Sequence, residues 1–122
     1  QSISRPWPLD PIPFVLDRRD WLRIEAAVAQ RAMLLNTILA DLYGPQNLLR
    51  EHHLPAELIH PHPAFLRACH GFQPPKGIYL HSYAADIARS PDGQWWVIGD
   101  RTQAPSGAGY ALENRLVASR ML

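Results

Sequence analysis

Cysteine is nearly missing from this sequence: Cys69 is the only one among 122 residues. A single thiol excludes an intramolecular disulfide. The chain does not need one, because a domain of this size buries roughly two-thirds of the surface that its unfolded form exposes. Since unpaired thiols are typical of the reducing cytosol, we expect a cytoplasmic protein.

Long apolar runs and an excess of one charge are missing as well. No stretch of about 18 apolar residues is present, and the N-terminus has none of the zones of a signal peptide. Lys plus Arg total 12 and Asp plus Glu total 11, a formal net charge of +1. So weak a field does not hold a polyanion, and we expect neither nucleic acid nor a membrane as a partner. Lysine is scarce too, since Lys76 is the only one.

The composition that is present, 47% hydrophobic and 19% charged, is that of one small globular domain. Residues 1–19 alternate prolines with apolar residues, which predicts a proline-rich extended segment ahead of a single domain over 20–122. The chain starts at Gln1 and stops within a helical pattern at Leu122. We therefore expect a fragment of a longer protein, with a complete small domain as the alternative.

A long helix is predicted over residues 21–42, where apolar side chains recur at helical spacing. Asp20 is its expected N-cap. Tyr43-Gly44-Pro45 ends it, with the glycine in the left-handed conformation of a C-cap. Charged residues on the polar face of this helix are assigned to solvation; they are Arg23, Arg31 and Asp41.

Residues 45–73 predict short connecting helices at 46–52, 56–59 and 64–70, separated by prolines. Most of the six histidines lie in this stretch, at His52, His53, His60, His62 and His70. No Cys or His pair repeats at the spacing of a zinc site. A metal-binding domain is therefore the weakest function considered, and a pH-sensitive surface patch is an open alternative.

After residue 77 the apolar period changes to two. Residues 78–89 and 94–102 are rich in Tyr, Ile, Val and Trp and flank the turn Ser90-Pro91-Asp92-Gly93, which predicts an antiparallel β-hairpin. A last helix is predicted over 110–122. The fold class is therefore α+β, and we expect the hairpin to belong to a larger sheet because a lone hairpin is marginally stable.

The loop over residues 103–109 joins the second strand to the last helix and carries glycines. Such a loop at a helix N-terminus can present backbone N–H groups to an anion. A helix capped by Ser106, with glycines for tight geometry, is the alternative.

Residues 86–98 and 100–115 carry a recognisable pattern, whose most specific part is Pro105-Ser106-Gly107 followed by Tyr110 and Asn114-Arg115. This pattern resembles the circularly permuted, type 2 ATP-grasp proteins, which are bacterial proteins related to glutathionylspermidine synthase. Residues 5–13, 34–36 and 41–46 fit the N-terminal region of the same family. Its members run to several times this length, so the resemblance implies one part of an α/β ATP-grasp fold.

The resemblance implies ATP-dependent joining of a carboxylate to an amine through an acylphosphate, with ATP and Mg²⁺ as cofactors of the full-length protein. Arg101 and Arg115 are then candidate catalytic residues. The candidate nucleotide-binding residues are Ser106, Gly107, Ala108, Gly109 and Asn114. For Asn114 and Arg115, packing back onto the hairpin is the alternative.

Family members take their Mg²⁺ ligands from an Asp on one strand and a Glu-x-Asn on the next. Asp86 falls on that Asp, but Gly99 falls on the Glu and Arg101 on the Asn. If Asp92-Gly93 forms a two-residue turn, Asp86 faces Gly99 and lies diagonal to Arg101. We therefore expect an ion pair between Asp86 and Arg101 in place of a metal site. Direct binding of a phosphate or carboxylate by Arg101 is the alternative.

The resemblance implies the N-terminal portion of a carboxylate–amine ligase with altered metal ligands, and lysine, which many nucleotide sites use to reach phosphates, is scarce in this chain. We expect this portion to be inactive alone and to bind neither ATP nor Mg²⁺ as an isolated fragment. The expected partners are the remainder of its own polypeptide and small-molecule carboxylate and amine substrates. A non-catalytic scaffold or interaction domain is the alternative function.

Overall fold

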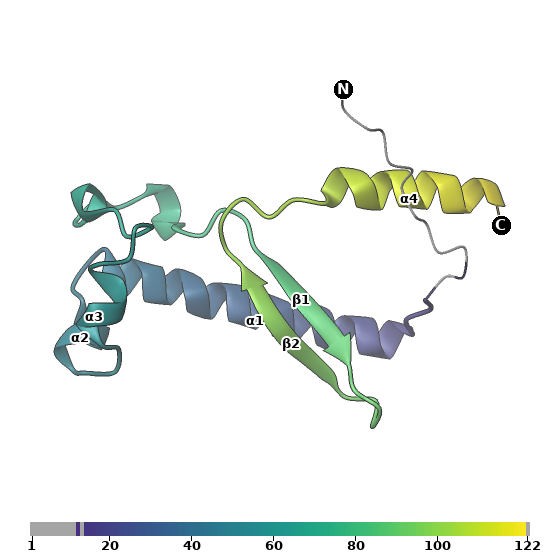
Figure 1. Cartoon of the computed structure of the whole chain (residues 1–122), viewed down its shortest axis with the longest axis horizontal. Helices are drawn as coiled ribbons and strands as arrows, with labels where there is room; N and C mark the ends of the chain where they lie inside the picture. The colour runs from purple at the N-terminus through teal and green to yellow at the C-terminus, as the bar shows by residue number, and fades with distance from the viewer. Residues whose placement is uncertain (1–11, 13, 122) are drawn as a thin grey trace.

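The computed structural model describes residue 12 and residues 14–121, so most of the predicted extended segment over 1–19 lies outside the described residues. A long helix is followed by a segment of short helices over residues 43–83, called the arm below, and then by a hairpin and a last helix (Figure 1). The bounds of the helices and strands are α1 Arg18–Leu42, α2 Asn47–Arg50, α3 Ala56–Ile59, β1 Ala84–Arg89, β2 Trp95–Arg101 and α4 Ala108–Met121. The predicted α+β class is confirmed.

Helix α1 begins earlier than predicted, because its N-cap is Asp17. The Asp17 carboxylate accepts a hydrogen bond from the backbone N–H of Asp20 at 2.7 Å, which satisfies one of the free donors of the first turn. Asp20 is therefore not the N-cap, contrary to the prediction. Its side chain instead accepts a hydrogen bond from the indole Nε1 of Trp95 at 3.2 Å.

The end of α1 falls where it was predicted, but for a different reason. Tyr43 is the C-cap, with an ordinary right-handed backbone, and the left-handed residue nearby is Gln46, with φ of 56°. Gly44 serves close packing instead: a Cβ on this residue would lie 2.7 Å from the carbonyl oxygen of Ala40. The prediction of a left-handed glycine cap at this helix end was therefore wrong.

The arm between α1 and the hairpin is less helical than the sequence predicts. Helix α3 matches the prediction, whereas α2 is shorter and the predicted helix over 64–70 reduces to a 3₁₀ turn, Arg67–Cys69. Asp41 holds the start of α2, because its two carboxylate oxygens accept hydrogen bonds from the backbone N–H groups of Asn47 and Leu48, each at 2.9 Å. The assignment of Asp41 to simple solvation was therefore wrong.

The hairpin has a three-residue loop and a bulge. Ser90 donates its N–H to the carbonyl of Gln94 at 2.9 Å, and Gly93 adopts a φ of 84° that suits glycine. Close to this loop Ile87 pairs with Val97, but farther along the ladder Asp86 pairs with Gly99, so Ile98 is left as the extra residue of a β-bulge. The predicted two-residue turn was wrong, while the predicted pairing of Asp86 with Gly99 is confirmed.

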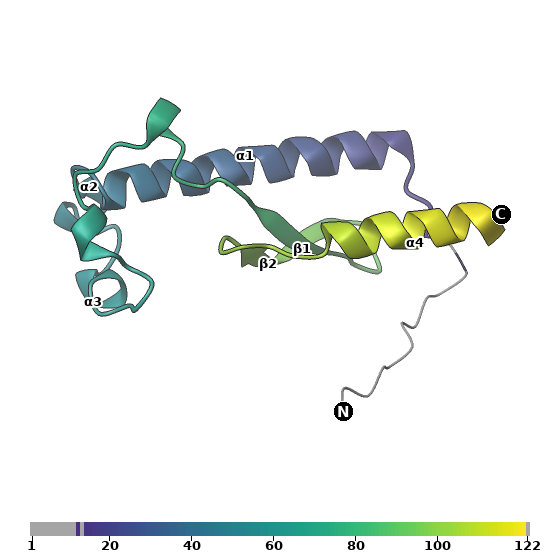
Figure 2. The same cartoon turned by 90° about the horizontal axis from the view of Figure 1, so that it is seen from above.

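One face of the hairpin lies against α1, as the two views in Figures 1 and 2 show. On this inner face Trp95 reaches Asp20 of α1, and its ring also makes an edge contact with Phe14 at 6.2 Å between centroids.

Few apolar side chains are buried: among the described residues they are Ile24, Leu42 and Leu49. In the part of the chain that the structure describes, no helix has both the length and the apolarity needed to cross a membrane.

Candidate functional site

Asp86 and Arg101 form an ion pair on the outer face of the hairpin, the face turned away from α1. The guanidinium Nε of Arg101 donates to both carboxylate oxygens of Asp86, at 3.1 and 3.0 Å, and Nη2 lies 3.0 Å from Oδ2. Both side chains remain open to solvent, with 62% of Arg101 and 45% of Asp86 exposed. The carboxylate raises the pKa of Arg101, first by hydrogen bonding and then by charge attraction, so this arginine stays a cation.

Gly99 makes room for this ion pair. It lies opposite Asp86 across the ladder, and a Cβ at Gly99 would be 3.3 Å from Oδ2 of Asp86. The diagonal position of Arg101 then brings its side chain over the glycine to the carboxylate. The ion pair expected from the sequence is therefore present in the structure.

The bulge at Ile98 decides which way the next residues point. Because side chains alternate between faces, the register found near the loop would place Ile98 opposite Asp86 and Asp100 on the outer face. One extra residue reverses this order. Asp100 is thereby turned toward α1, and Arg101 is turned toward Asp86.

Asp100 forms a second charged cluster on the inner face. Arg31 of α1 holds its carboxylate with two hydrogen bonds, from Nε and Nη2, each at 2.6 Å, and the hydroxyl of Tyr83 donates a third at 2.6 Å. Arg31 first, and then Tyr83, lower the pKa of Asp100 to about 2. The assignment of Arg31 to a solvated helix face was wrong. Its position seven residues after the buried Ile24 is the sequence signal that could have found it.

Asn36 of α1 was not singled out as a contact residue by the sequence, yet it anchors the chain ahead of β1. Its carbonyl oxygen accepts hydrogen bonds from the backbone N–H groups of Tyr79 and Leu80 at 2.8 and 3.0 Å, and its amide donates to the carbonyl of Gly77 at 3.1 Å. These contacts occupy backbone groups that a strand would use. Strand β1 therefore begins at Ala84, whereas the sequence predicts a strand from residue 78.

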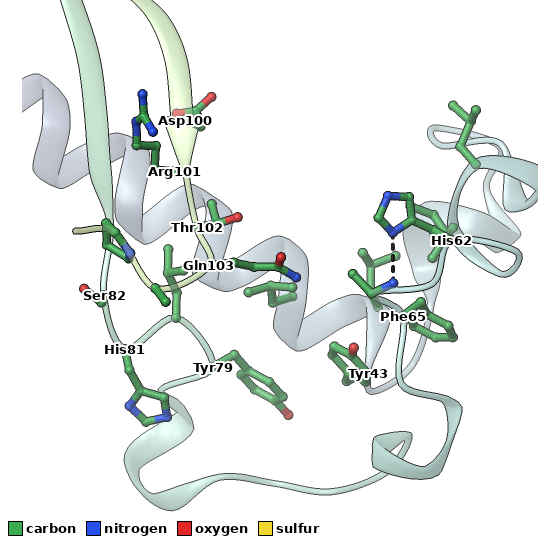
Figure 3. Close-up of a pocket in the computed structure, with 18 of the residues that line it drawn as sticks. Tyr43, His62, Phe65, Tyr79, His81, Ser82, Asp100, Arg101, Thr102 and Gln103 are labelled. Atoms are coloured by element: carbon green, nitrogen blue, oxygen red, sulfur yellow. Dashed lines mark hydrogen bonds between the residues drawn. The ribbon is translucent and has the colours of Figure 1, made fainter. Parts of the chain in front are cut away.

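An open cleft of about 1030 Å³ lies between the arm and the loop that follows β2 (Figure 3). One wall is aromatic: the ring of Tyr43 stacks on Phe65 at 5.2 Å and on Tyr79 at 6.3 Å between centroids. The opposite wall is formed by residues 100–106, of which Ala104 and Pro105 have apolar side chains and the other five have polar ones. The cleft therefore joins an apolar surface to the strand end that carries both ion pairs.

The candidate nucleotide-binding residues lie partly on this cleft. Ser106 lines it, whereas Gly107 begins the turn into α4 with a φ of 118°. The carbonyl of Gly107 accepts the first helical hydrogen bond, from Ala111 at 2.9 Å, so Gly107 and not Ser106 takes the N-cap position. Ala108 and Gly109 form the first turn of α4.

The candidates on α4 lie farther along the chain. Asn114 is half-buried and Arg115 is exposed. Among the described residues Arg115 forms no ion pair with Asp86 or with any other carboxylate. The structure therefore brings Arg101 and Asp86 together but does not add Arg115 to them.

The donor set at Asp86 does not fit Mg²⁺, which prefers several oxygen ligands around it. The neighbouring residues are Gly99, which has no side chain, and Arg101, a cation bound to the same carboxylate. Asp100 is turned to the opposite face by its contact with Arg31. Across the described residues, no group of three or more His, Cys, Asp or Glu side chains is placed to hold a metal ion.

The histidines of the arm serve local structure. His70 Nε2 lies 3.0 Å from the carbonyl oxygen of Gly44, and the ring of His60 packs edge-on against Phe65. His62 Nδ1 accepts a hydrogen bond from the N–H of Ala64 at 3.2 Å, as Figure 3 shows.

Comparison with known proteins gives the family and its extent. A family model described as circularly permuted ATP-grasp type 2 matches residues 13–122. An uncharacterized protein of Mycobacterium tuberculosis is 48% identical over 114 residues, which are 93% of this chain and 13% of that protein. An uncharacterized protein of Synechocystis is 37% identical over 117 residues, 96% of this chain and 24% of that protein. The chain therefore spans from about an eighth to a quarter of these two relatives, by those shares of 13% and 24%.

Proposed function

Because this chain belongs to the circularly permuted ATP-grasp type 2 family, we propose that it forms one wall of a ligase-type cleft whose usual metal site has become an ion pair. The observation that carries this proposal is the contact of Arg101 with both oxygens of Asp86. It occupies the carboxylate that would otherwise bind a cation. The family membership supports ATP-dependent chemistry for the longer protein.

The substrates that this proposal favours are a small carboxylate and a small amine, joined as in the synthases of glutathionylspermidine. The cleft supports this class because an apolar wall around Tyr43 and Tyr79 faces a mostly polar wall at Arg101 to Ser106. An arginine with unused N–H groups suits a carboxylate or phosphate oxygen. In this proposal Arg101 holds an anionic group, and Ser106 lies near enough to line the same space.

ATP and Mg²⁺ would be cofactors of the longer protein, with the ion held by residues outside this chain. The chain itself has one lysine, Lys76, in a 3₁₀ turn, Pro75–Gly77, remote in sequence from the loop after β2. It therefore lacks the lysines with which ATP-grasp proteins hold phosphates. We expect the isolated chain to bind Mg-ATP poorly.

A non-catalytic scaffold is the second candidate function. The same ion pair favours it, because a family member that has lost its metal ligands can keep the fold without the chemistry. The two functions differ in whether the longer protein hydrolyses ATP when an amine and a carboxylate are supplied.

The test is phosphate release by the full-length protein with Mg-ATP and a panel of amines and carboxylates. A ligase gives release that requires both substrates, and it falls at least tenfold in an Arg101→Ala variant. If phosphate release does not depend on the substrates and stays at the level of heat-inactivated protein, the ligase proposal is overturned and the scaffold function remains. A parallel calorimetric titration of the 122-residue chain with Mg-ATP should show no micromolar binding.

A further inference from the structure

The outer face of the hairpin exposes two large apolar side chains beside the ion pair. Trp96 is 60% exposed and Ile98 is 71% exposed. Figure 1 looks onto this face, with α1 passing behind the strands, and Figure 2 shows α1 on one side of the hairpin only. No described helix is seen to lie across the outer face in these two views.

Few apolar side chains are buried among the described residues. Ile24, Leu42 and Leu49 are the buried apolar side chains among the described residues. Much of the apolar surface of the described residues is therefore open to a further layer of protein.

The outer face carries little net charge, because Asp86 and Arg101 neutralise each other at its centre. Such a face does not select a polyanion or a charged membrane surface. Apolar side chains around a neutral pair suit an apolar protein surface, because exclusion of water strengthens the attraction within the pair and so offsets part of the cost of removing both charges from water. The occupant is therefore protein.

The remainder of a longer polypeptide is the occupant that the comparisons favour. The two relatives described above continue far beyond the matched segment, since it covers 13% and 24% of their lengths. A covalently attached segment is present at high effective concentration, so even a modest apolar face is covered. A lone two-stranded hairpin also gains stability when another layer packs on it.

We propose that the outer face of the hairpin docks against the part of the full-length polypeptide that lies outside residues 1–122, burying Trp96 and Ile98 beside the Asp86–Arg101 ion pair. This interface does not depend on ligase activity. A non-catalytic scaffold would need the same interface. A protein without ligase activity can therefore still show protection of the outer face, so the two proposals fail in different experiments.

The experiment compares maleimide labelling of an Ile98→Cys variant in the full-length protein and in the 122-residue chain, with peptide-resolved mass spectrometry to separate this site from Cys69. We expect labelling to be at least tenfold slower in the full-length protein. A Trp96→Cys variant repeats the measurement at the second exposed position. Ile98 is the exposed extra residue of the bulge and has no partner across the ladder, whereas Trp96 also donates a hydrogen bond to the Ser90 hydroxyl; circular dichroism of each variant checks its folding.

Met33→Cys is the matched control. Met33 is 67% exposed and lies two positions beyond Arg31 on α1, which turns it away from the hairpin. Equal labelling rates at residue 98 in the two proteins would overturn the proposal, as would equal protection at residues 33 and 98. If residue 98 is already protected from maleimide in the 122-residue chain, and more so at higher protein concentration, the outer face binds a second copy of the chain and the proposal is overturned.

Discussion

Asp100 and Arg101 are neighbours in the chain, carry opposite charges and contact different parts of the molecule. Asp100 is held by Arg31 of α1 on the inner face, and Arg101 is held by Asp86 on the outer face. The first contact fixes the strand to the long helix. The second occupies the carboxylate of Asp86. The face on which each residue lies therefore decides which partner it contacts.

The Arg31–Asp100 contact predicts a dependence of stability on pH. The pKa of Asp100 is lowered from 3.8 to about 2 in the folded chain. A lowered carboxyl pKa gives stability that is present above pH 3.8 and is lost as the pH falls toward 2. The melting temperature should therefore drop between about pH 5 and 2, and less steeply in an Arg31→Gln variant. An Arg23→Gln variant is the control, and an unchanged slope in Arg31→Gln would contradict the prediction.

Asn36 predicts a loss of stability on truncation. An Asn36→Ala variant removes three hydrogen bonds to the backbone of residues 77–80. At about 0.5–1.5 kcal/mol for each bond, the free energy of unfolding should fall by about 1.5–4.5 kcal/mol. Urea unfolding measures it. Thr37→Ala is the control, because the Thr37 hydroxyl donates a hydrogen bond within its own helix, to the carbonyl of Met33 at 2.9 Å. Equal losses of unfolding free energy in the two variants would contradict the anchoring role of Asn36.

At the scale of elements, the bulge at Ile98 is what makes both ion pairs compatible. The three-residue loop and the bulge each shift the register by one residue, and the shifts cancel at Asp86. The pairing of Asp86 with Gly99 was predictable because it follows from a regular ladder with a shorter turn. A one-residue bulge was an open alternative, and Gly99 is a residue that often marks one, but the sequence does not decide that Ile98 is the extra residue.

A deletion and an insertion test this account of the hairpin. Removing Ile98 leaves Gly99, Asp100 and Arg101 in their present pairing, so both ion pairs and the cross-strand NOE between Asp86 and Gly99 should persist. Inserting one alanine after Gly99 turns Asp100 outward and Arg101 inward, so both pairs are lost and the melting temperature should fall. If deletion and insertion have the same effect, the ladder does not have the register described here.

The elements themselves were mostly predictable, and the failures have a common cause. Helices α1 and α4, the hairpin and the order of the arm follow from apolar period and proline placement. Strand β1 is shorter than its pattern because Asn36, distant in sequence, takes the backbone hydrogen bonds of residues 79 and 80. The helix start moved because Asp17 competes with Asp20 for the same capping role. Both corrections come from contacts that a periodic pattern does not contain.

At the scale of the whole molecule, the described residues are arranged around the long helix α1. A cleft lies between the arm and the loop after β2, and the outer face of the hairpin is exposed. The family and the expected ion pair were accessible from the sequence because a continuous motif carries both. The cleft was not, because its walls come from the end of α1, the arm and the loop after β2. Only the fold joins these segments, and the Tyr43–Phe65–Tyr79 stack has no sequence signature.

We infer that Arg101 takes the place of a divalent cation beside Asp86. A Mn²⁺ titration of the ¹⁵N-labelled chain tests this directly, through paramagnetic broadening of the amide signals of Asp86 and Gly99. We expect no selective broadening at these amides in the unaltered chain, and selective broadening in a variant that combines Arg101→Asn with Gly99→Glu. Selective broadening around Asp86 in the unaltered chain would contradict it.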